Sequence, residues 1–410
     1  MKEKETIQLK GMVEIKSKAL GTTIEIDRLI GKYSRNIEGP TVIFIGGMHG
    51  NEPSGVFALH SILQELNRLK PPFRGELYAF GGNLTALSLG VRYVEKDLNR
   101  IWNLSRIREM MAGEDYSNKE CTDEKEQREL FRALRSAYLG KKHVYIFDLH
   151  TTSSESRPFT TIADTLRNRQ FALNFPMPVI LGIEEQLEGT LLNYINELGP
   201  LAVGFEGGQH DAIATIEIHK AVIWLALYHC HCLPKERLPD YNALYRTIAE
   251  KSENSSKIYE VRYRHEIDAN QGFKMLAGFT NFQKIRKGDV LACTKNENIN
   301  SIETGMIFLP LYQNQGNDGF FLVREFMPFW LKISKFVRTR RLERILPYLP
   351  GIRKHPDNNS SLIVNRKIAR WYVMEVLHLF GYRRKTTENG KLVVTKRKYD
   401  IDEPDVIIDS

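Results

Sequence analysis

The strongest constraint on the fold is an alternation, between residues 41 and 233, of short apolar runs with longer amphipathic segments. Near-continuous apolar runs are typical of strands buried on both faces, and the longer segments have helix length. The alternation predicts an α/β fold with a mainly parallel or mixed sheet flanked by helices. We expect strands at Thr41–Ile45, Glu76–Phe80, Val144–Leu149 and Leu201–Phe205, and helices at Pro53–Leu69, Lys125–Leu139 and His210–His229.

The chain divides into three regions on these patterns. Residues 1–235 form the α/β region, and residues 236–325 form a linker and a small β module in which Gly, Asn and Asp punctuate short β-type runs. Residues 326–410 form a basic C-terminal extension that is partly helical. In it we expect a basic amphipathic stretch over Phe329–Leu346, a polar break, a helix around Leu362–Leu379 and a hairpin over residues 386–396.

The positive charge of the chain is concentrated in the extension. Residues 326–398 hold 18 Lys and Arg against four acids, a balance of +14, so the rest of the +8 chain carries −6. We therefore expect no nucleic-acid partner for the whole protein. Four cysteines do not make a disulfide framework, the charged N-terminus does not resemble a signal peptide, and no apolar run has membrane-spanning length. These features predict a cytoplasmic location.

Four side chains follow three of the expected strands. His49 and Glu52 lie in the glycine-rich turn "GGMHGNEPSG", His150 ends "VYIFDLH", and Glu206 ends "LAVGFE". Ligands of open α/β sheets bind outside the carboxyl ends of the strands, so these side chains are expected to converge. Two histidines and one carboxylate, with a position left for water, are a typical ligand set of catalytic zinc.

Further residues complete a hydrolytic site. Glu206 is the candidate base that takes a proton from water and passes it to a leaving amine. Asp148 points the same way along its strand as His150 and could fix the tautomer of that histidine. Arg92 and Arg100, in "VRYVEKDLNR", suit a developing oxyanion and a substrate carboxylate.

The motifs "GGMHGNEPSG", "VRYVEKDLNR", "FDLHTT" and "GFEGG" together resemble the succinylglutamate desuccinylase/aspartoacylase branch of the zinc carboxypeptidase superfamily. The resemblance covers about residues 42–325. It implies a zinc carboxypeptidase-like fold and one zinc ion per chain, held by His49, Glu52 and His150, with Glu206 as general base. It also implies that Arg92 polarises the scissile carbonyl, and that Asn99 and Arg100 hold a substrate carboxylate.

These observations predict a zinc-dependent hydrolase of a linear, non-peptide amide in a small N-acyl compound. One alternative is a metallocarboxypeptidase with the same chemistry, which an open groove would favour. Another is a peripheral membrane-binding protein acting through residues 329–346, where aromatic and aliphatic residues alternate with Lys and Arg. Against this last alternative, we expect the apolar face of that stretch to pack on the α/β region.

The expected substrate differs from those of the family named above. The aspartoacylases use an additional arginine shortly before the catalytic glutamate and a tyrosine from the β module, whereas residues 186–205 contain no Arg or Lys. Phe320 and Phe321 stand where that tyrosine is expected, and with Tyr194 they would favour a more apolar substrate. A monoanionic or neutral N-acyl compound is therefore expected, unless Arg157 supplies the missing cation.

Overall fold

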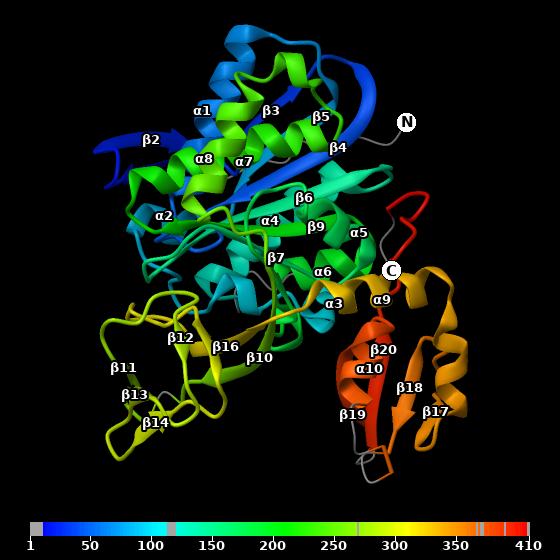
Figure 1. The fold of residues 1–410 in the computed structure, drawn as a ribbon. Helices are drawn as coiled ribbons and strands as arrows, with labels where there is room; N and C mark the ends of the chain where they lie inside the picture. The colour runs from blue at the N-terminus through cyan, green and yellow to red at the C-terminus, as the bar shows by residue number, and fades with distance from the viewer. Residues whose placement is uncertain are drawn as a thin grey trace.

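The computed structural model describes residues 11–112, 120–268, 270–365, 368–369, 373–388 and 391–407 (Figure 1). Its main feature is an eleven-stranded mixed sheet. In spatial order the strands are β12 (Lys284–Ile285), β15 (Gly305–Phe308), β16 (Asp318–Glu325), β10 (Ile258–Glu266), β8 (Val179–Leu181), β7 (Phe159–Ile162), β9 (Leu201–Gln209), β6 (Val144–Thr152), β4 (Ile37–Gly46), β5 (Arg74–Gly81) and β3 (Leu29–Ser34).

The centre of this sheet is parallel and contains all four predicted strands. They form β5, β4, β6 and β9, which are direct neighbours and run in the same direction. Side chains alternate between two cores, as a strand buried on both faces requires: Val42 and Phe44 of β4 face one core, and Ile43 and Ile45 face the other. The predicted α/β fold is confirmed.

Helices cover both faces of the sheet. One face packs against α1 (Ser54–Leu69), α5 (Leu166–Ala172), α7 (Ile213–His229) and α8 (Tyr241–Lys251). The other packs against α3 (Leu104–Ala112), α4 (Thr122–Tyr138) and α6 (Leu191–Leu198). The three predicted helices are confirmed as α1, α4 and α7, and α1 begins directly after Pro53, its N-cap residue. Short helices at α2 (Leu84–Leu89), η1 (Leu98–Arg100), η2 (Ile183–Glu185) and η3 (Lys235–Arg237) complete the connections.

The β module is joined to the α/β region by the sheet itself. Strand β10 pairs in parallel with β8, and β16 and β15 add antiparallel strands beyond it. Smaller sheets are formed by β11 (Lys274–Met275), β13 (Val290–Cys293) and β14 (Asn298–Asn300), and by β1 (Val13–Ser17) and β2 (Thr22–Ile26). The boundaries at residues 235 and 325 remain predictions.

The extension forms a four-stranded antiparallel sheet and two helices, and it corrects one prediction. The elements are α9 (Pro328–Thr339), η4 (Leu342–Tyr348), β17 (Ile352–Lys354), β18 (Ser361–Val364), α10 (Val373–Leu379), β19 (Tyr382–Glu388) and β20 (Lys391–Lys396). The helix expected around Leu362–Leu379 is wrong in its first part, because residues 361–364 pair with β17 and β20 as a strand. The hairpin over residues 386–396 is confirmed as β19 and β20, although its turn residues 389 and 390 lie outside the described residues.

Helix α9 also corrects the expected packing. Its buried residues are Ser334 and Arg338, whereas Phe329, Trp330 and Phe336 are exposed. Leu331 packs against the core of the α/β region and Val337 against the core of the extension, so the expected packing is found for these two residues and not for the three aromatic ones. No helix in the described ranges is both long and apolar enough to cross a membrane.

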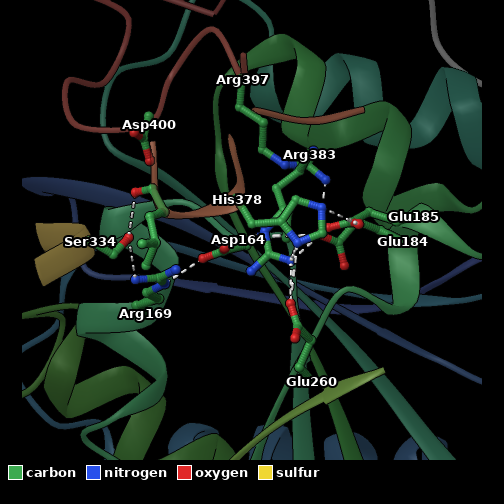
Figure 2. A network of polar contacts seen from close by, with 12 residues as sticks. Asp164, Arg169, Glu184, Glu185, Glu260, Ser334, His378, Arg383, Arg397 and Asp400 are labelled. Carbon is green, nitrogen blue, oxygen red and sulfur yellow. Dashed lines mark hydrogen bonds and ion pairs between the residues drawn. The ribbon is translucent and has the colours of Figure 1, made fainter. Parts of the chain in front are cut away.

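Buried ion pairs attach the extension to the rest of the molecule (Figure 2). Arg383 contacts Asp164 at 2.6 Å and Glu260 at 2.8 Å, and Arg338 contacts Asp164 at 3.2 Å. We call the group around these contacts the docking network. Its members are Asp164, Glu184, Glu185, Glu260, Asp400, Arg169, Arg338, Arg383, Arg397 and His378.

The chain after β20 runs back onto the α/β region. The Asp400 carbonyl accepts a hydrogen bond from the Arg167 amide at 3.3 Å. Ile407 exchanges backbone hydrogen bonds with Gly140 and Lys141 and buries its side chain in the core beneath α4. Residues 400–407 therefore act as a strap across the α/β region.

Candidate active site

The turn after β4 presents His49 and Glu52 at the end of the central sheet. The turn lies close against neighbouring backbone, since a Cβ on Gly50 would sit 2.0 Å from the carbonyl carbon of Ala86. Only glycine fits at that distance. The Gly50 amide donates to the Arg92 carbonyl at 3.1 Å, so the turn and the "VRYVEKDLNR" loop are held together.

The Glu52 carboxylate lies between the two histidines. One oxygen is 2.9 Å from His49 Nδ1, and the other is 3.1 Å from His150 Nδ1 and accepts the Thr151 amide at 2.9 Å. Burial alone would raise the pKa of Glu52, but the two histidines hold the pKa well below its usual range. His49, Glu52 and His150 each offer a ligand atom, and these atoms lie within 4.8 Å of one another. The structure thus brings the three predicted metal ligands together.

Asp148 lies beside His150, as strand alternation predicts. Its Oδ2 is 2.8 Å from His150 Nε2, and its Oδ1 is buried without a hydrogen-bond partner among the described residues. Burial alone would lower the pKa of His150, but the Asp148 and Glu52 carboxylates raise the pKa well above its usual value. The His150 ring is therefore oriented by a carboxylate at each nitrogen.

Glu206 lies on β9, directly across from His150 on β6 in the strand register. Its Oε2 is buried and has no hydrogen-bond partner in the described part of the chain. Burial raises the pKa of Glu206 to about 8. A carboxyl group with such a pKa can exchange a proton near neutral pH, which is what a general base and acid requires.

Arg92 is held at the same site by Asp97, a residue that the sequence analysis missed. Its guanidinium contacts Asp97 at 3.0 Å and lies 3.6 Å from Glu52. Asp97 also lies 3.2 Å from His49 Nε2. The Asp97 side chain caps η1 and accepts a hydrogen bond from the Asn99 amide. It belongs to the motif "VRYVEKDLNR", so its place two residues before Asn99 could have identified it from the sequence.

Asn99 and Arg100 line the pocket but already have partners. The Asn99 side-chain oxygen accepts the Leu191 amide at 2.9 Å. Arg100 contacts Asp318 of the β module at 2.6 Å, and Asp318 also binds Arg264 at 2.6 Å. The charge of Arg100 is therefore shared with a protein carboxylate, and its proposed role toward a substrate remains a prediction.

A cavity of about 150 Å³ lies at this site and is lined by His49, Glu52, Arg92, Asn99, Arg100, His150 and Glu206. Further polar lining comes from His210, Gln313 and Asp318, which the sequence analysis did not identify. It also comes from Glu184, Thr151, Thr152, Ser153, Ser154, Thr161, Thr190, Asn193 and Asn196. The apolar lining residues are Ile162, Ala163, Ile183, Leu187, Leu192, Leu309, Pro310 and Leu311.

The residues expected to make the pocket apolar do not line it. Phe320, Phe321 and Tyr194 are buried in three separate hydrophobic cores. Arg157 does not line the cavity either, because its guanidinium stacks on Phe282 and pairs with Glu253. The apolar part of the pocket wall is formed by the other residues named above, and Arg157 does not supply a cation to this pocket.

The charges of the site suit a metal cation. Glu52, Asp97, Asp148 and Glu206 are four carboxyl groups around two histidines, and Arg92 is the one arginine that contacts them in the described structure. Buried carboxylates are costly unless they are paired or bind a metal. Two imidazoles and a carboxylate are the donor types that zinc prefers, so these residues fit the metal expected from the sequence.

Residues 38–222 match the family model described as the succinylglutamate desuccinylase/aspartoacylase catalytic domain. A succinylglutamate desuccinylase of Pseudomonas syringae pv. tomato is 31% identical over 122 residues, which cover 29% of this chain and 33% of that protein. An N-acyl-aromatic-L-amino acid amidohydrolase (carboxylate-forming) of Xenopus tropicalis is 24% identical over 242 residues, covering 56% of this chain and 71% of that protein. The chain thus spans about a third of the length of the first of these relatives.

Two crystal structures show the same fold. A succinylglutamate desuccinylase from Vibrio cholerae has a TM-score of 0.56 at 15% identity, covering 87% of this chain and 94% of that chain. A succinylglutamate desuccinylase/aspartoacylase from Rhodobacter sphaeroides has a TM-score of 0.55 at 15% identity, covering 78% and 95%.

Proposed function

Because this chain belongs, through residues 38–222, to the succinylglutamate desuccinylase/aspartoacylase family, we propose that it is a zinc-dependent amidohydrolase. Its proposed reaction is hydrolysis of the linear amide of an N-acyl amino acid or a related small N-acyl compound. The observation that carries the proposal is Glu206, whose Oε2 is buried without a hydrogen-bond partner among the described residues and which lies across the strand register from His150 of the His49, Glu52 and His150 cluster.

The proposed mechanism assigns one task to each group of residues. His49, Glu52 and His150 would hold one zinc ion, which when bound supplies a Lewis acid and lowers the pKa of water. Glu206 takes a proton from the attacking water and gives it to the departing amine. Arg92, kept in place by Asp97, stabilises the negative charge that develops on the carbonyl oxygen.

The pocket favours a small substrate with an apolar part. The β module contributes Leu309, Pro310, Leu311 and Gln313 to the wall of the cavity. A cavity of about 150 Å³ bounded in this way supports the amidohydrolase over the metallocarboxypeptidase alternative, which needs room for a peptide chain. Because Arg100 already pairs with Asp318, it offers weak binding to a second substrate carboxylate.

Zinc content tests the metal assignment. We expect about one zinc per chain in the wild type and loss of most of it in His150→Ala, because one of three protein ligands is removed. Inductively coupled plasma mass spectrometry on the purified proteins measures this, with His231→Ala, outside the pocket, as the matched histidine control. Full zinc occupancy in His150→Ala would overturn the assignment.

The turnover screen should use zinc-loaded protein with a panel of N-acyl amino acids and N-acyl amines. Product amine is measured directly, so the readout does not depend on which acyl group is removed.

The free thiols of Cys121, Cys230, Cys232 and Cys293 support a reducing compartment, and we propose the cytoplasm as the site of the reaction.

A further inference from the structure

Helix α9 exposes its aromatic residues to solvent. Its fully buried residues are Ser334 and Arg338, four residues apart and therefore on one side of the helix, where the partly buried Leu331 also packs against the core of the α/β region. Phe329 and Phe336, seven residues apart, share the opposite side and are 61% and 57% exposed. Trp330 is 43% exposed and contacts the Phe329 ring edge-on, with 5.4 Å between the ring centroids. We call Phe329, Trp330 and Phe336 the aromatic face of α9.

Polar contacts fix the helix in this orientation. Arg338 donates to the carbonyl oxygens of Asp164, His378 and Leu379 at 2.7 to 3.0 Å and pairs with the Asp164 and Asp400 carboxylates. The Ser334 hydroxyl donates to the Leu379 carbonyl at 2.8 Å and accepts from Arg169 at 3.2 Å. If the helix were rotated so that the aromatic face lay inward, the buried Asp164 and Asp400 carboxylates would lose Arg338 as a partner, which is strongly unfavourable. The exposure of the aromatic rings is thus built into the fold.

Positive charges surround the aromatic face. Lys332, Lys335 and Arg340 are exposed, and none of them forms an ion pair with a residue in the described ranges. Helix α9 itself contains no acidic residue. The guanidinium of Arg340 lies 5.8 Å from the centroid of the Phe336 ring, so charge and ring occupy the same surface. Arg341 and Arg344 follow directly and are also exposed.

We propose that the aromatic face of α9 and its flanking cations dock the protein on the surface of an anionic membrane. Aromatic side chains enter the boundary between headgroups and acyl chains, and Lys and Arg bind the anionic headgroups. Charge complementarity selects this occupant, because the unpaired cations around the rings need a negatively charged partner. The helix lies along the surface and does not span the membrane.

Vesicle sedimentation tests the proposal with the full-length protein. We expect binding to phosphatidylcholine vesicles that contain about one third phosphatidylserine, and at least about tenfold weaker binding to pure phosphatidylcholine vesicles. Raising the salt concentration should weaken binding, because it screens the headgroup charge. Failure of the wild type to sediment with the anionic vesicles would overturn the proposal.

Paired variants separate the aromatic and charge contributions. Phe329→Ser/Phe336→Ser and Lys332→Glu/Lys335→Glu should each reduce binding to the anionic vesicles by about tenfold or more. The matched controls carry the same changes at other exposed positions: Leu89→Ser/Leu173→Ser and Lys287→Glu/Lys295→Glu. These controls should bind as the wild type does, and equal binding by all variants would contradict the assignment to α9.

Two measurements identify other occupants of the same surface. A concentration-dependent dimer in analytical ultracentrifugation, abolished by Phe329→Ser/Phe336→Ser in a protein without vesicle binding, would replace the membrane with a second copy of the chain. Binding to an oligonucleotide that depends on Lys332 and Lys335, again without vesicle binding, would replace it with nucleic acid. Thermal melting confirms that each variant is folded. Hydrolase activity in solution does not enter the readout, so the test is independent of the proposed function.

Discussion

The molecule contains two buried clusters of charged side chains, and they differ in balance. The docking network sets five carboxylates against four arginines and one histidine. The cluster in the pocket sets Glu52, Asp97, Asp148 and Glu206 against Arg92 and two histidines. A cluster whose positive and negative charges balance is typical of a structural role. A cluster with an excess of carboxylates suits the binding of a cation and catalysis.

The difference shows how charged neighbours decide the pKa of two glutamates for which burial acts in the same direction. Burial alone would raise the pKa of Glu260, but His378 and Arg383 lower the pKa to about 2. Burial raises the pKa of Glu206 to about 8, because its charged neighbours do not offset the loss of water. The same residue type is thus a fixed charge in the docking network, whereas in the pocket its raised pKa suits the proton transfer proposed for Glu206.

Removing a cation from the docking network should have the largest effect. Arg383→Met removes the closest cation of Glu260 and one of the three arginines around Asp164, and we expect a loss of about 3–5 kcal/mol in the free energy of unfolding. Urea unfolding measures it. Arg344→Met, which removes an exposed arginine of the same extension, should stay within about 0.5 kcal/mol of the wild type. Equal urea midpoints for the two variants would show that the network does not stabilise the fold.

The free energy of unfolding at low pH should also depend on the docking network. Because the pKa of Glu260 is lowered from 4.5 to about 2, its charge stabilises the folded state above pH 4.5 and loses this effect as the pH falls to 2. The pKa difference corresponds to about 3 kcal/mol. Glu260→Gln should therefore lose stability near neutral pH, and its difference from the wild type should shrink by that amount toward pH 2. A difference independent of pH would contradict the Glu260 assignment.

The pocket should respond in activity and not in stability. Glu206→Gln removes the proton acceptor while keeping the shape, so we expect turnover to fall by about 10²-fold or more. Its unfolding free energy and zinc content should match the wild type, in contrast to the docking network variants. Glu217→Gln, an exposed glutamate on α7, is the control and should keep full turnover. Activity of Glu206→Gln within a few-fold of the wild type would assign the base elsewhere.

The smallest expected effect concerns substrate choice. The arginines of the docking network contact protein carboxylates, and among the described residues Arg92 and Arg100 are the arginines that line the pocket. We expect kcat/KM for a monoanionic or neutral N-acyl compound to exceed that for N-acetylaspartate by at least about tenfold, or about 1.4 kcal/mol. Steady-state kinetics on both classes measures this ratio. Efficient hydrolysis of N-acetylaspartate or succinylglutamate would show that the pocket binds two carboxylates.

The central sheet could be predicted because its strands are long and apolar. The run Thr41–Ile45 is buried on both faces, and such runs stand out in a sequence. Strands β7 and β8 were missed because they are four and three residues long, which is too short for a period to appear. Residues 362–364 were assigned to a helix because a three-residue apolar run fits both periods.

The site was predictable where strand ends place side chains, and not where loops do. His49, Glu52, Asp148, His150 and Glu206 all follow from the edge of one parallel sheet. Gln313 and Asp318 enter the pocket from the β module, through tertiary packing that spacing along the chain does not show. The orientation of α9 could not be predicted either, because amphipathic periodicity gives two faces but not which one is buried. The ion pairs of Arg338 decide it.

The strap of residues 400–407 bears on how the protein is made in the cell. Ile407 fills part of the core beneath α4. Asp400 accepts hydrogen bonds from the amides of residues 166 and 167 and forms an ion pair with Arg338. These residues leave the ribosome after every segment they pack against. The region that holds the pocket therefore emerges first and lacks part of its core until the strap has been synthesised.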